Sequence, residues 1–507
     1  RIARTRPEAA LLMNVIAGDR SLTIADMVAL ADPETTLAIS DDAWKRIADA
    51  RAIADEELER GAVVYGLTVG LGGKVTMPIE RDSVPDFEKS VISARIVGVG
   101  DPLAEHVARR ALGLRIVNIC HGRSAVSQRV VEVLLAMYNA RVTPVVASLG
   151  SIGSSDLGQC SQLCATVVGV GNVWVDGRQV SALDGLASIG REPVTLGAKD
   201  ALGLFNSGAV TQALAVEYVA DVRTVMTAAT ISAVATCDAY GVNPTPFTTE
   251  VTATKSVRGG DAASERIMSL LSGSWTLEDG AISRAQHPIS FRTLVPLLAL
   301  VEESLARFVD EIEHEVNSST DSPVVLHESR TVRSSVNFQP LAAAVAGEAL
   351  SIALTHWSNA AVNRTIKMAN HSLADVPRFL APDEGQSVGF NALMKSSVAM
   401  ATRVRFEANP ASVDFFAVSD GTEDVASQLP LVVEKLTRQC DAFRRLIAIE
   451  AFTAHQLASL RQPRRWGLAT TRILEVCGRH VPVIEHDQPL GGFVDALTEC
   501  IARGELH

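Results

Sequence analysis

Apolar residues recur at steps of three and four along most of the chain, which is the spacing of one face of a helix. Leu103, Val107 and Ala111 follow it within a helical region from about Pro85 to Ala140, and residues 41–60 indicate a further helix. Longer stretches rich in Ala, Val and Leu follow in the second half of the chain: 209–235, 294–316, 341–366 and 425–460. Segments of this length predict a mostly α-helical protein built around a bundle of long helices.

Loops and one short hairpin interrupt the helical pattern. Residues 66–73 contain four glycines, and residues 143–158 are rich in Gly, Ser and Pro, so both segments are expected to be loops. Residues 174–180 surround the pair Asp176-Gly177, which predicts two short strands joined by a tight turn. The loops are the expected places for functional side chains, because they can converge on one pocket from a rigid scaffold.

The composition narrows the class of protein. The 507 residues carry a net charge of −12 without a run of Lys or Arg, so nucleic acid is not expected as a partner. No stretch of about 18 uninterrupted apolar residues occurs, so neither a transmembrane helix nor a membrane partner is expected. The apolar stretch 11–17 is too short for a signal peptide, which favours a soluble, cytoplasmic protein.

Seven cysteines are scattered along the chain, and none forms the paired spacing of a zinc motif. Cys160 and Cys164 lie four residues apart, as on one face of a helix. We therefore expect reduced, buried thiols and no metal ion.

Five separated segments carry residues suited to chemistry. Residues 65–72 read YGLTVGLG, in which glycines let the backbone pass close to a substrate and Tyr65 offers a phenol as acid or base. Residues 150–157 read GSIGSSDL, and residues 199–208 read KDALGLFNSG. The remaining segments are Ser283-Arg284, NSSTDSP at 317–323 with NFQ at 337–339, and NPASVD at 409–414 with TED at 422–424.

In this order and spacing, the segments resemble those of the aromatic amino acid ammonia-lyase superfamily, and of its histidine ammonia-lyase branch in particular. The resemblance implies an ammonia-lyase-like fold, with an N-terminal α+β domain over residues 1–200 and a long-helix bundle over residues 201–507. It also implies a homotetramer in which each active site is built from three subunits, with a small amino-acid-like molecule as substrate.

The resemblance assigns roles to individual residues. Arg284 would hold the substrate carboxylate, a task that suits the two parallel hydrogen bonds of a guanidinium. Asn206 would lie at the reaction centre, and Glu423 corresponds to the glutamate in the Gln-Glu-Asp segment of the histidine ammonia-lyase branch. Substrate-binding residues are expected at four positions: Asn206, Asn317, Phe338 and Gln339.

The loop at residues 153–156 departs from the family's pattern. In the family an Ala-Ser-Gly tripeptide cyclises into the electrophilic methylidene-imidazolone group (MIO). Here only Ser154 and Ser155 stand between Gly153 and Asp156, so the loop is one residue short and lacks the glycine that permits ring closure. We therefore expect no MIO and no other cofactor, unless Gly153, Ser154 and Ser155 still cyclise.

Four positions expected in the pocket also differ from the family. Ala281 replaces a tyrosine, and Ala94-Arg95 replaces a Ser-His pair that selects the substrate. Lys395 stands where the family usually has a small or apolar residue. Two interpretations remain open for each cation, since Lys395 fits a helix surface and Arg95 fits a pair with a neighbouring acid as well as a pocket.

A substrate whose nitrogen is already quaternary accommodates these departures, because trimethylamine leaves as a neutral molecule without help from MIO. Ergothionase, an MIO-lacking relative that releases trimethylamine from ergothioneine, is the branch of the family to compare first with this chain. Glu423 would then pair with an imidazole N–H, and Arg95 or Lys395 would meet the sulfur. Two alternatives remain: an MIO-dependent histidine or aromatic ammonia-lyase or aminomutase, and a non-catalytic ligand-binding homologue.

Elimination requires a base for the β-proton. Tyr65 is the expected base, with Lys395 and Glu423 as the other candidates. A phenol in water titrates near pH 10, so this assignment requires a cation such as Arg95 or Lys395 beside it.

Overall fold

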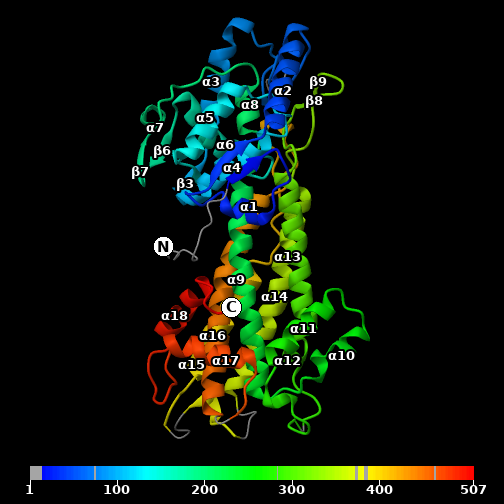
Figure 1. Ribbon diagram of the computed structural model, residues 1–507, viewed down its shortest axis with the longest axis vertical. Helices are drawn as coiled ribbons and strands as arrows, with labels where there is room; N and C mark the ends of the chain where they lie inside the picture. Colours follow the sequence, from blue (N-terminus) through cyan, green and yellow to red (C-terminus); the bar gives the residue numbers. More distant parts are fainter. Residues whose placement is uncertain (1–13, 73–75, 283, 371–374, 382–385, 462–463) are drawn as a thin grey trace.

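The computed structural model describes residues 14–72, 76–282, 284–370, 375–381, 386–461 and 464–507. It is elongated and mostly helical, with a head of short helices and strands at one end of a long bundle (Figure 1). The bundle consists chiefly of four helices: α9 (Ala209–Tyr240), α13 (Leu294–Val316), α14 (Leu341–Ala369) and α16 (Leu429–Leu460). The predicted fold class, mostly α with a long-helix bundle and a smaller α+β part, is confirmed.

Small side chains let the bundle helices pack closely. Every residue of α9 from Ala228 to Tyr240 is buried, and most of them are Ala, Val, Ser or Thr. A fully buried ion pair also joins α14 to α16, where Arg364 donates to both carboxylate oxygens of Glu450 at 2.6 and 3.2 Å. Because both charges lie away from water, removal of one partner would leave the other uncompensated.

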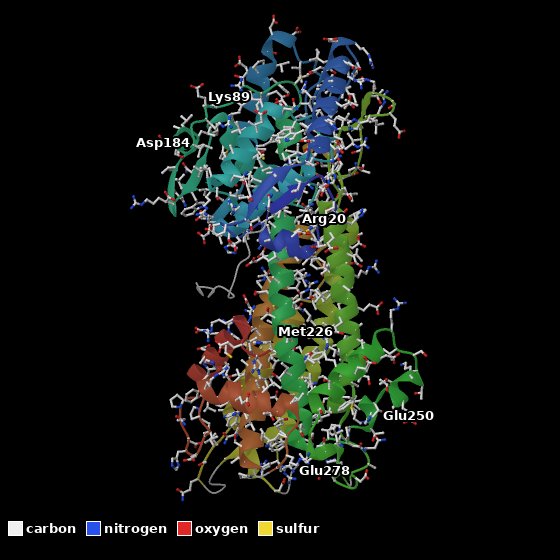
Figure 2. All side chains as sticks on the ribbon, in the orientation of Figure 1. Arg20, Lys89, Asp184, Met226, Glu250 and Glu278 are labelled. Carbon is white, nitrogen blue, oxygen red and sulfur yellow. The ribbon has the colours of Figure 1, made fainter. Side chains whose placement is uncertain are left out.

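Six shorter helices of the described residues surround the half of the bundle that lies away from the head, whose far end we call the distal end (Figure 1). They are α10 (Thr249–Ala253), α11 (Gly260–Leu271), α12 (Ile289–Arg292), α15 (Asn391–Phe406), α17 (Leu468–His480) and α18 (Gly491–Ala502). Figure 2 places Met226 midway along the bundle and Glu278 at the distal end. At 1.5 Å per residue, the ends of α9 are roughly 45 Å apart.

The head contains eight helices and four small sheets among the described residues. Its helices are α1 (Ile24–Ala29), α2 (Asp41–Glu59), α3 (Val84–Ala94), α4 (Glu105–Ile119), α5 (Gln128–Asn139), α6 (Leu157–Cys164), α7 (Ala182–Ser188) and α8 (Asp200–Phe205). Side-chain oxygens of Thr23, Ser40 and Ser181 accept backbone N–H groups at the starts of α1, α2 and α7.

The sheets of the head are short. Parallel β1 (Asn14–Ala17) and β2 (Thr36–Ile39) form one, and antiparallel β3 (Val99–Pro102) and β5 (Ala147–Leu149) form another. The third has the order β4 (Thr143–Pro144), β6 (Asn172–Val175), β7 (Arg178–Ser181). The fourth is the hairpin of β8 (Val324–Leu326) and β9 (Thr331–Arg333), which packs on α2 and so brings the second half of the chain into the head.

Several predicted elements agree with the structure. The hairpin expected at residues 174–180 is β6–β7, and its turn residues Asp176 and Gly177 have φ angles of 47° and 72°, as a two-residue hairpin turn requires. Helix α13 has the predicted bounds, whereas α16 begins at Leu429, four residues later than expected. All seven cysteines are free and buried. Within the described residues, no helix is both long enough and apolar enough to cross a membrane.

Candidate active site

A cleft lies in the head, beside α8. It encloses about 290 Å³, close to the lower end of the range of small-molecule sites. Its lining residues come from separate segments of the chain: Tyr65, Gly72, Arg95, Ser154, Leu157, Leu202, Phe205, Asn206, Ser322, Ser334, Ser335, Phe338, Thr422 and Glu423. The cleft therefore brings together Tyr65, Arg95, Ser154, Asn206, Phe338 and Glu423, all predicted from the sequence as site residues.

The glycine-rich loop positions the phenol of Tyr65. Gly66 has a φ of 66°, and a Cβ atom there would lie 2.4 Å from Cδ2 of Leu202, so only glycine fits this turn. The backbone N–H of Gly72 donates to the phenolic oxygen of Tyr65 at 3.0 Å. This hydrogen bond fixes the direction of the phenolic oxygen within the cleft.

Arg95 supplies a cation to the same cleft. It follows the end of α3, and its guanidinium lies over the ring of Phe205, 4.9 Å from the centroid. Burial lowers the pKa of Arg95, and the negative charges of Tyr65 and Glu423 oppose that shift. The cation that the sequence required near Tyr65 is therefore present in the pocket.

Glu423 enters the cleft from a tight turn. Its backbone pairs with that of Val418, since the N–H of Val418 donates to the carbonyl of Glu423 at 2.9 Å. The hydroxyl of Ser419 donates to Oε1 of Glu423 at 2.8 Å. One carboxylate oxygen is thus held by the protein, whereas no group of the described residues donates a hydrogen bond to Oε2.

The loop at residues 153–155 has its peptide groups engaged by neighbouring segments. The backbone N–H of Ser155 donates to the carbonyl of Phe338 at 3.1 Å, and the hydroxyl of Ser427 donates to the carbonyl of Gly153 at 2.7 Å. Ser155 has a φ of 56°, in the left-handed region. Gln339 donates through Nε2 to the hydroxyl of Ser154 at 2.8 Å, which places Gln339 against the loop.

Asp156 anchors the loop from behind and does not line the cleft. Its carboxylate accepts from the hydroxyl of Ser151 at 2.7 Å and from both the backbone N–H and the hydroxyl of Thr211 at 2.7 Å. Complete burial raises the pKa of Asp156 despite these donors. The residue therefore joins the loop to the first turn of α9.

Asn206 is fixed at the end of α8. Its Nδ2 donates to the carbonyl of Ser322 at 2.9 Å, and its Oδ1 accepts from the hydroxyl of Ser155. Asn317, by contrast, does not reach the cleft. Its amide exchanges hydrogen bonds with the backbone of Leu22 at 2.7 and 2.8 Å and thereby fastens the N-terminal segment to α13.

Arg284 and Lys395 lie far from this cleft within one chain. Arg284 is exposed beside His287, which contacts Tyr240 at the distal end of α9, whereas Asn206 precedes the other end of that helix. Lys395 is exposed on α15, where its Nζ donates to the carbonyl of Asn391 at 3.3 Å. Ser283 and its hydroxyl lie outside the described residues.

Several residues that line the cleft were not predicted from the sequence. Ser322, Ser334 and Ser335 give the cleft hydroxyl groups, and Leu202 and Phe205 give it an apolar wall. The spacing of residues 334–335 carries no signal, because the β8–β9 hairpin brings them to the cleft only in the folded chain.

Comparisons with known proteins agree with this architecture. Residues 22–478 match the family described as aromatic amino acid lyase. Histidine ammonia-lyase of Aromatoleum aromaticum is 29% identical over 95% of this chain and 92% of its own length, and that of Symbiobacterium thermophilum is 28% identical over 96% of each.

Solved structures share the fold. Ergothionase from Treponema denticola, an ergothioneine-degrading enzyme solved with desmethyl-ergothioneine sulfonic acid, superposes with a TM-score of 0.94 at 24% identity over 97% of this chain and 99% of its own. Histidine ammonia-lyase from Trypanosoma cruzi superposes with a TM-score of 0.87 at 26% identity, over 97% and 94%. The chain belongs to the aromatic amino acid lyase family and is a carbon–nitrogen lyase of the ammonia-lyase superfamily.

Proposed function

We propose that this lyase eliminates a tertiary amine from the betaine of an imidazole amino acid, without MIO, and that ergothioneine is the first substrate to test. The observation that carries the proposal is the loop at residues 153–155, because both of its reacting peptide groups have other partners. Ring closure requires the nitrogen of Ser155 to attack the carbonyl carbon of Gly153. Instead, the N–H of Ser155 is directed to Phe338, and the carbonyl of Gly153 accepts from Ser427.

The side chain at the third position adds to this mismatch. A glycine there leaves room for the tight approach, whereas Ser155 carries a Cβ and a hydroxyl that is bonded to Asn206. These residues do not fit the MIO group, and no step of the proposed reaction uses it.

A quaternary ammonium makes the group unnecessary. A base removes a proton from the β-carbon, the C–H electron pair forms the new C=C bond, and the C–N bond breaks. The nitrogen keeps the electron pair of that bond and leaves as neutral trimethylamine, while the proton remains on the base. The reaction therefore requires a base, a carboxylate-binding site and a means to orient the ring.

Three residues of the cleft fit these tasks. Tyr65 is the base, and its phenolate is supported by the N–H of Gly72 and the charge of Arg95. Glu423 orients the imidazole ring through the carboxylate oxygen that Ser419 leaves open. Arg95 also offers a cation to the thiolate-like sulfur of a 2-thioimidazole.

The carboxylate site is proposed to come from a neighbouring subunit. Arg284 lies near the distal end of α9, roughly 45 Å from Asn206, so no bend of one side chain can bring the two together. A homotetramer that places the distal end of one chain against the head of another would complete the cleft. Lys395, which also lies near the distal end, would arrive from a neighbour in the same way.

Histidine ammonia-lyase activity is the second candidate function, because the curated relatives that match the whole chain carry that name. It requires an MIO made from Gly153, Ser154 and Ser155. The two functions differ in the amine that is released and in the mass of the protein, so one set of measurements separates them.

The test supplies the purified chain with ergothioneine, histidine, histidine betaine and phenylalanine, and measures trimethylamine and ammonia. Intact mass is recorded on the same sample. We expect trimethylamine from ergothioneine and a mass equal to that of the translated sequence. Ammonia from histidine, together with a mass lower by two water molecules, would contradict the proposal and establish the second candidate.

A further inference from the structure

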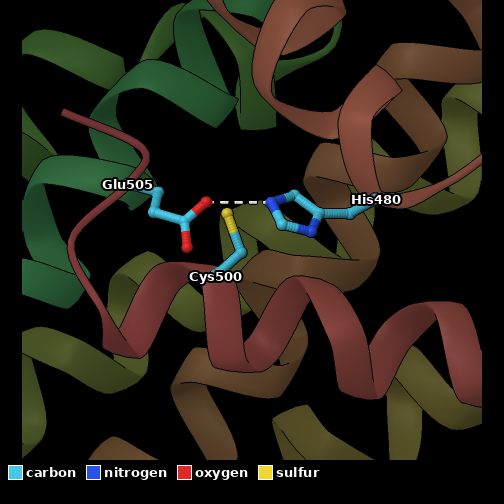
Figure 3. A group of neighbouring side chains, drawn as sticks. All are labelled: His480, Cys500 and Glu505. Atoms are coloured by element: carbon cyan, nitrogen blue, oxygen red, sulfur yellow. Dashed lines mark hydrogen bonds and ion pairs between the residues drawn. The ribbon is translucent and has the colours of Figure 1, made fainter. Parts of the chain in front are cut away.

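A cluster of three different metal-binding side chains lies beside the middle of α9, partly buried and away from the cleft. It consists of His480, the last residue of α17; Cys500 on α18; and Glu505, in the segment that follows α18. Figure 3 shows the three side chains converging on one point. Their ligand atoms all lie within 4.8 Å of one another, and this is the one such group of three or more among the described residues.

The distances suit a small ion. Nε2 of His480 lies 2.9 Å from Oε2 of Glu505, and the thiol of Cys500, which is 1% exposed, faces the same point. Zinc holds sulfur at about 2.3 Å and nitrogen or oxygen at about 2.0 Å, so its tetrahedral ligands are roughly 3.5 Å apart. The His480–Glu505 pair would need to open by only a few tenths of an ångström.

The carboxylate of Glu505 is already oriented. Its Oε1 accepts from Nε of Arg503 at 2.6 Å, which leaves Oε2 to face His480. A partner that holds the second oxygen of a carboxylate ligand is the usual support of a metal site.

The surrounding charges also permit an ion. Arg479 and Arg503 lie near Cys500, and Arg472 donates to the carbonyl of Glu505 at 3.3 Å. A divalent ion bound by one thiolate and one carboxylate is neutral as a unit, so these arginines do not repel it. Arg503 also pairs with Glu499 at 3.7 Å, which offsets part of its charge.

We propose that Nε2 of His480, Sγ of Cys500 and Oε2 of Glu505 form a zinc site, with a water molecule as the fourth ligand. A thiolate and an imidazole favour zinc over magnesium or calcium, which prefer oxygen ligands alone. The thiol loses its proton to solvent when the ion binds. The ion would fasten the segment after α18 to the end of α17, so its role is to hold the C-terminal segment in place.

The experiment treats the full chain with a chelator, removes the chelator, and titrates the protein with Co²⁺ as a spectroscopic substitute for zinc. We expect one Co²⁺ per chain, with the charge-transfer band of a cobalt–thiolate bond and the visible bands of a tetrahedral ion. Zn²⁺ should displace the cobalt and abolish both signals.

Variants assign the ligands. Cys500→Ser should abolish the charge-transfer band, and His480→Ala or Glu505→Gln should weaken binding by about 10-fold or more, because loss of a direct ligand costs at least as much as loss of a supporting partner. Glu505 is only half-buried, so Glu505→Gln is the variant that tests the site if Cys500→Ser, which alters a buried residue, does not fold.

Two matched controls are available. Cys237→Ser alters another thiol that is 1% exposed. His106→Ala alters a His–Glu pair in which Nε2 of His106 lies 3.3 Å from Oε1 of Glu217, and which belongs to no group of three potential metal ligands among the described residues. Both variants should bind Co²⁺ as the unaltered chain does. Absence of the charge-transfer band from the unaltered protein, or its persistence in Cys500→Ser, would overturn the proposal in favour of a hydrogen-bonded latch without metal.

Discussion

The hydroxyl of Ser155 donates a hydrogen bond to Oδ1 of Asn206 across 2.5 Å, and the two residues are only 4% and 5% exposed. With Nδ2 of Asn206 bonded to Ser322, the amide has a single orientation in the cleft. Ser155 thus helps to position Asn206. A glycine at this place could not do so, because it has no side chain.

Ser155→Ala is expected to leave Oδ1 of Asn206 buried without a donor. The free energy of unfolding should fall by about 1–3 kcal/mol, and kcat/KM should fall with it because the amide is no longer held. Thermal or denaturant unfolding and steady-state kinetics measure both effects. Ser161→Ala is the matched control, since the Ser161 hydroxyl is also buried and has no hydrogen-bond partner within the described part of the chain, so its removal should cost little.

Arg284→Lys should reduce kcat/KM by roughly 10–100-fold on the true substrate, because lysine keeps the charge but loses the paired hydrogen bonds to a carboxylate. Arg292→Lys is a suitable control, as Arg292 lies on the nearby α12 and donates to the carbonyl of His287 at 2.7 Å. Equal kinetics for the Arg284 variant and the unaltered chain would show that the carboxylate binds elsewhere.

Mixed assemblies of Tyr65→Phe and Arg284→Ala chains should recover activity that neither variant has alone. The reason is that the two residues lie at opposite ends of the folded molecule and would meet only between neighbouring chains. A mixed assembly therefore contains some sites in which both groups are intact. Activity after co-refolding or co-expression measures the recovery, and light scattering gives the size of the assembly. Failure to recover would mean that one chain supplies both residues, and a monomer in solution would refute the shared site altogether.

Tyr65→Phe should lower kcat by about 100-fold or more, in the range of general acid–base catalysis, with little change in the binding of a substrate analogue. The phenyl ring keeps the wall of the cleft, whereas the oxygen that accepts the proton is removed. Pre-steady-state kinetics with substrate deuterated at the β-carbon would locate the loss in the proton-transfer step. Near-normal turnover of Tyr65→Phe would show that Tyr65 is not the base, and Glu423 or Lys395 would then be assigned that role.

Glu88→Gln should remove part of the dependence of stability on pH. Glu88 on α3 accepts the backbone N–H groups of Lys199 and Ala201 at 2.9 and 2.6 Å, and burial raises its pKa to about 7. Because the folded chain holds this proton more tightly than the unfolded chain, the stabilisation is full below about pH 4.5 and is lost as the pH rises through about 7.

The measurement is the free energy of unfolding of both proteins between pH 4.5 and 8. The advantage of the unaltered chain over Glu88→Gln should shrink across this interval by up to about 3 kcal/mol, at 1.36 kcal/mol for each unit of pKa difference. A constant difference would show that Glu88 does not titrate in this range.

Periodicity was sufficient to predict the bundle but not the geometry of the site. The long helices follow from runs of Ala, Val and Leu, and the β6–β7 hairpin follows from Asp176-Gly177, because each depends on local sequence. The partners of Glu88 and the convergence of His480, Cys500 and Glu505 depend on segments that meet only after folding, so no spacing could indicate them.

Resemblance to a family also could not separate residues that bind a ligand from those that shape the protein. Asn317 and Arg284 both lie in segments similar to the family's, yet the amide of Asn317 is occupied by Leu22, and Arg284 is remote from the cleft of its own chain. The order of motifs along the sequence indicates which residues belong to one family pattern. It does not indicate whether those residues contribute to the active site of their own chain or to that of a neighbouring chain.

The length of α9 has a consequence for populations of damaged chains. In the proposed assembly a site is complete only when the chain that supplies Tyr65 and the chain that supplies Arg284 are both intact. Activity would then fall with the square of the intact fraction if every damaged chain lacks both residues, and more gently if damage is divided between the two ends. Because α9 separates the two sets of residues by roughly 45 Å, the activity of each chain depends on its neighbours, and a defective chain lowers the activity of the intact chains around it.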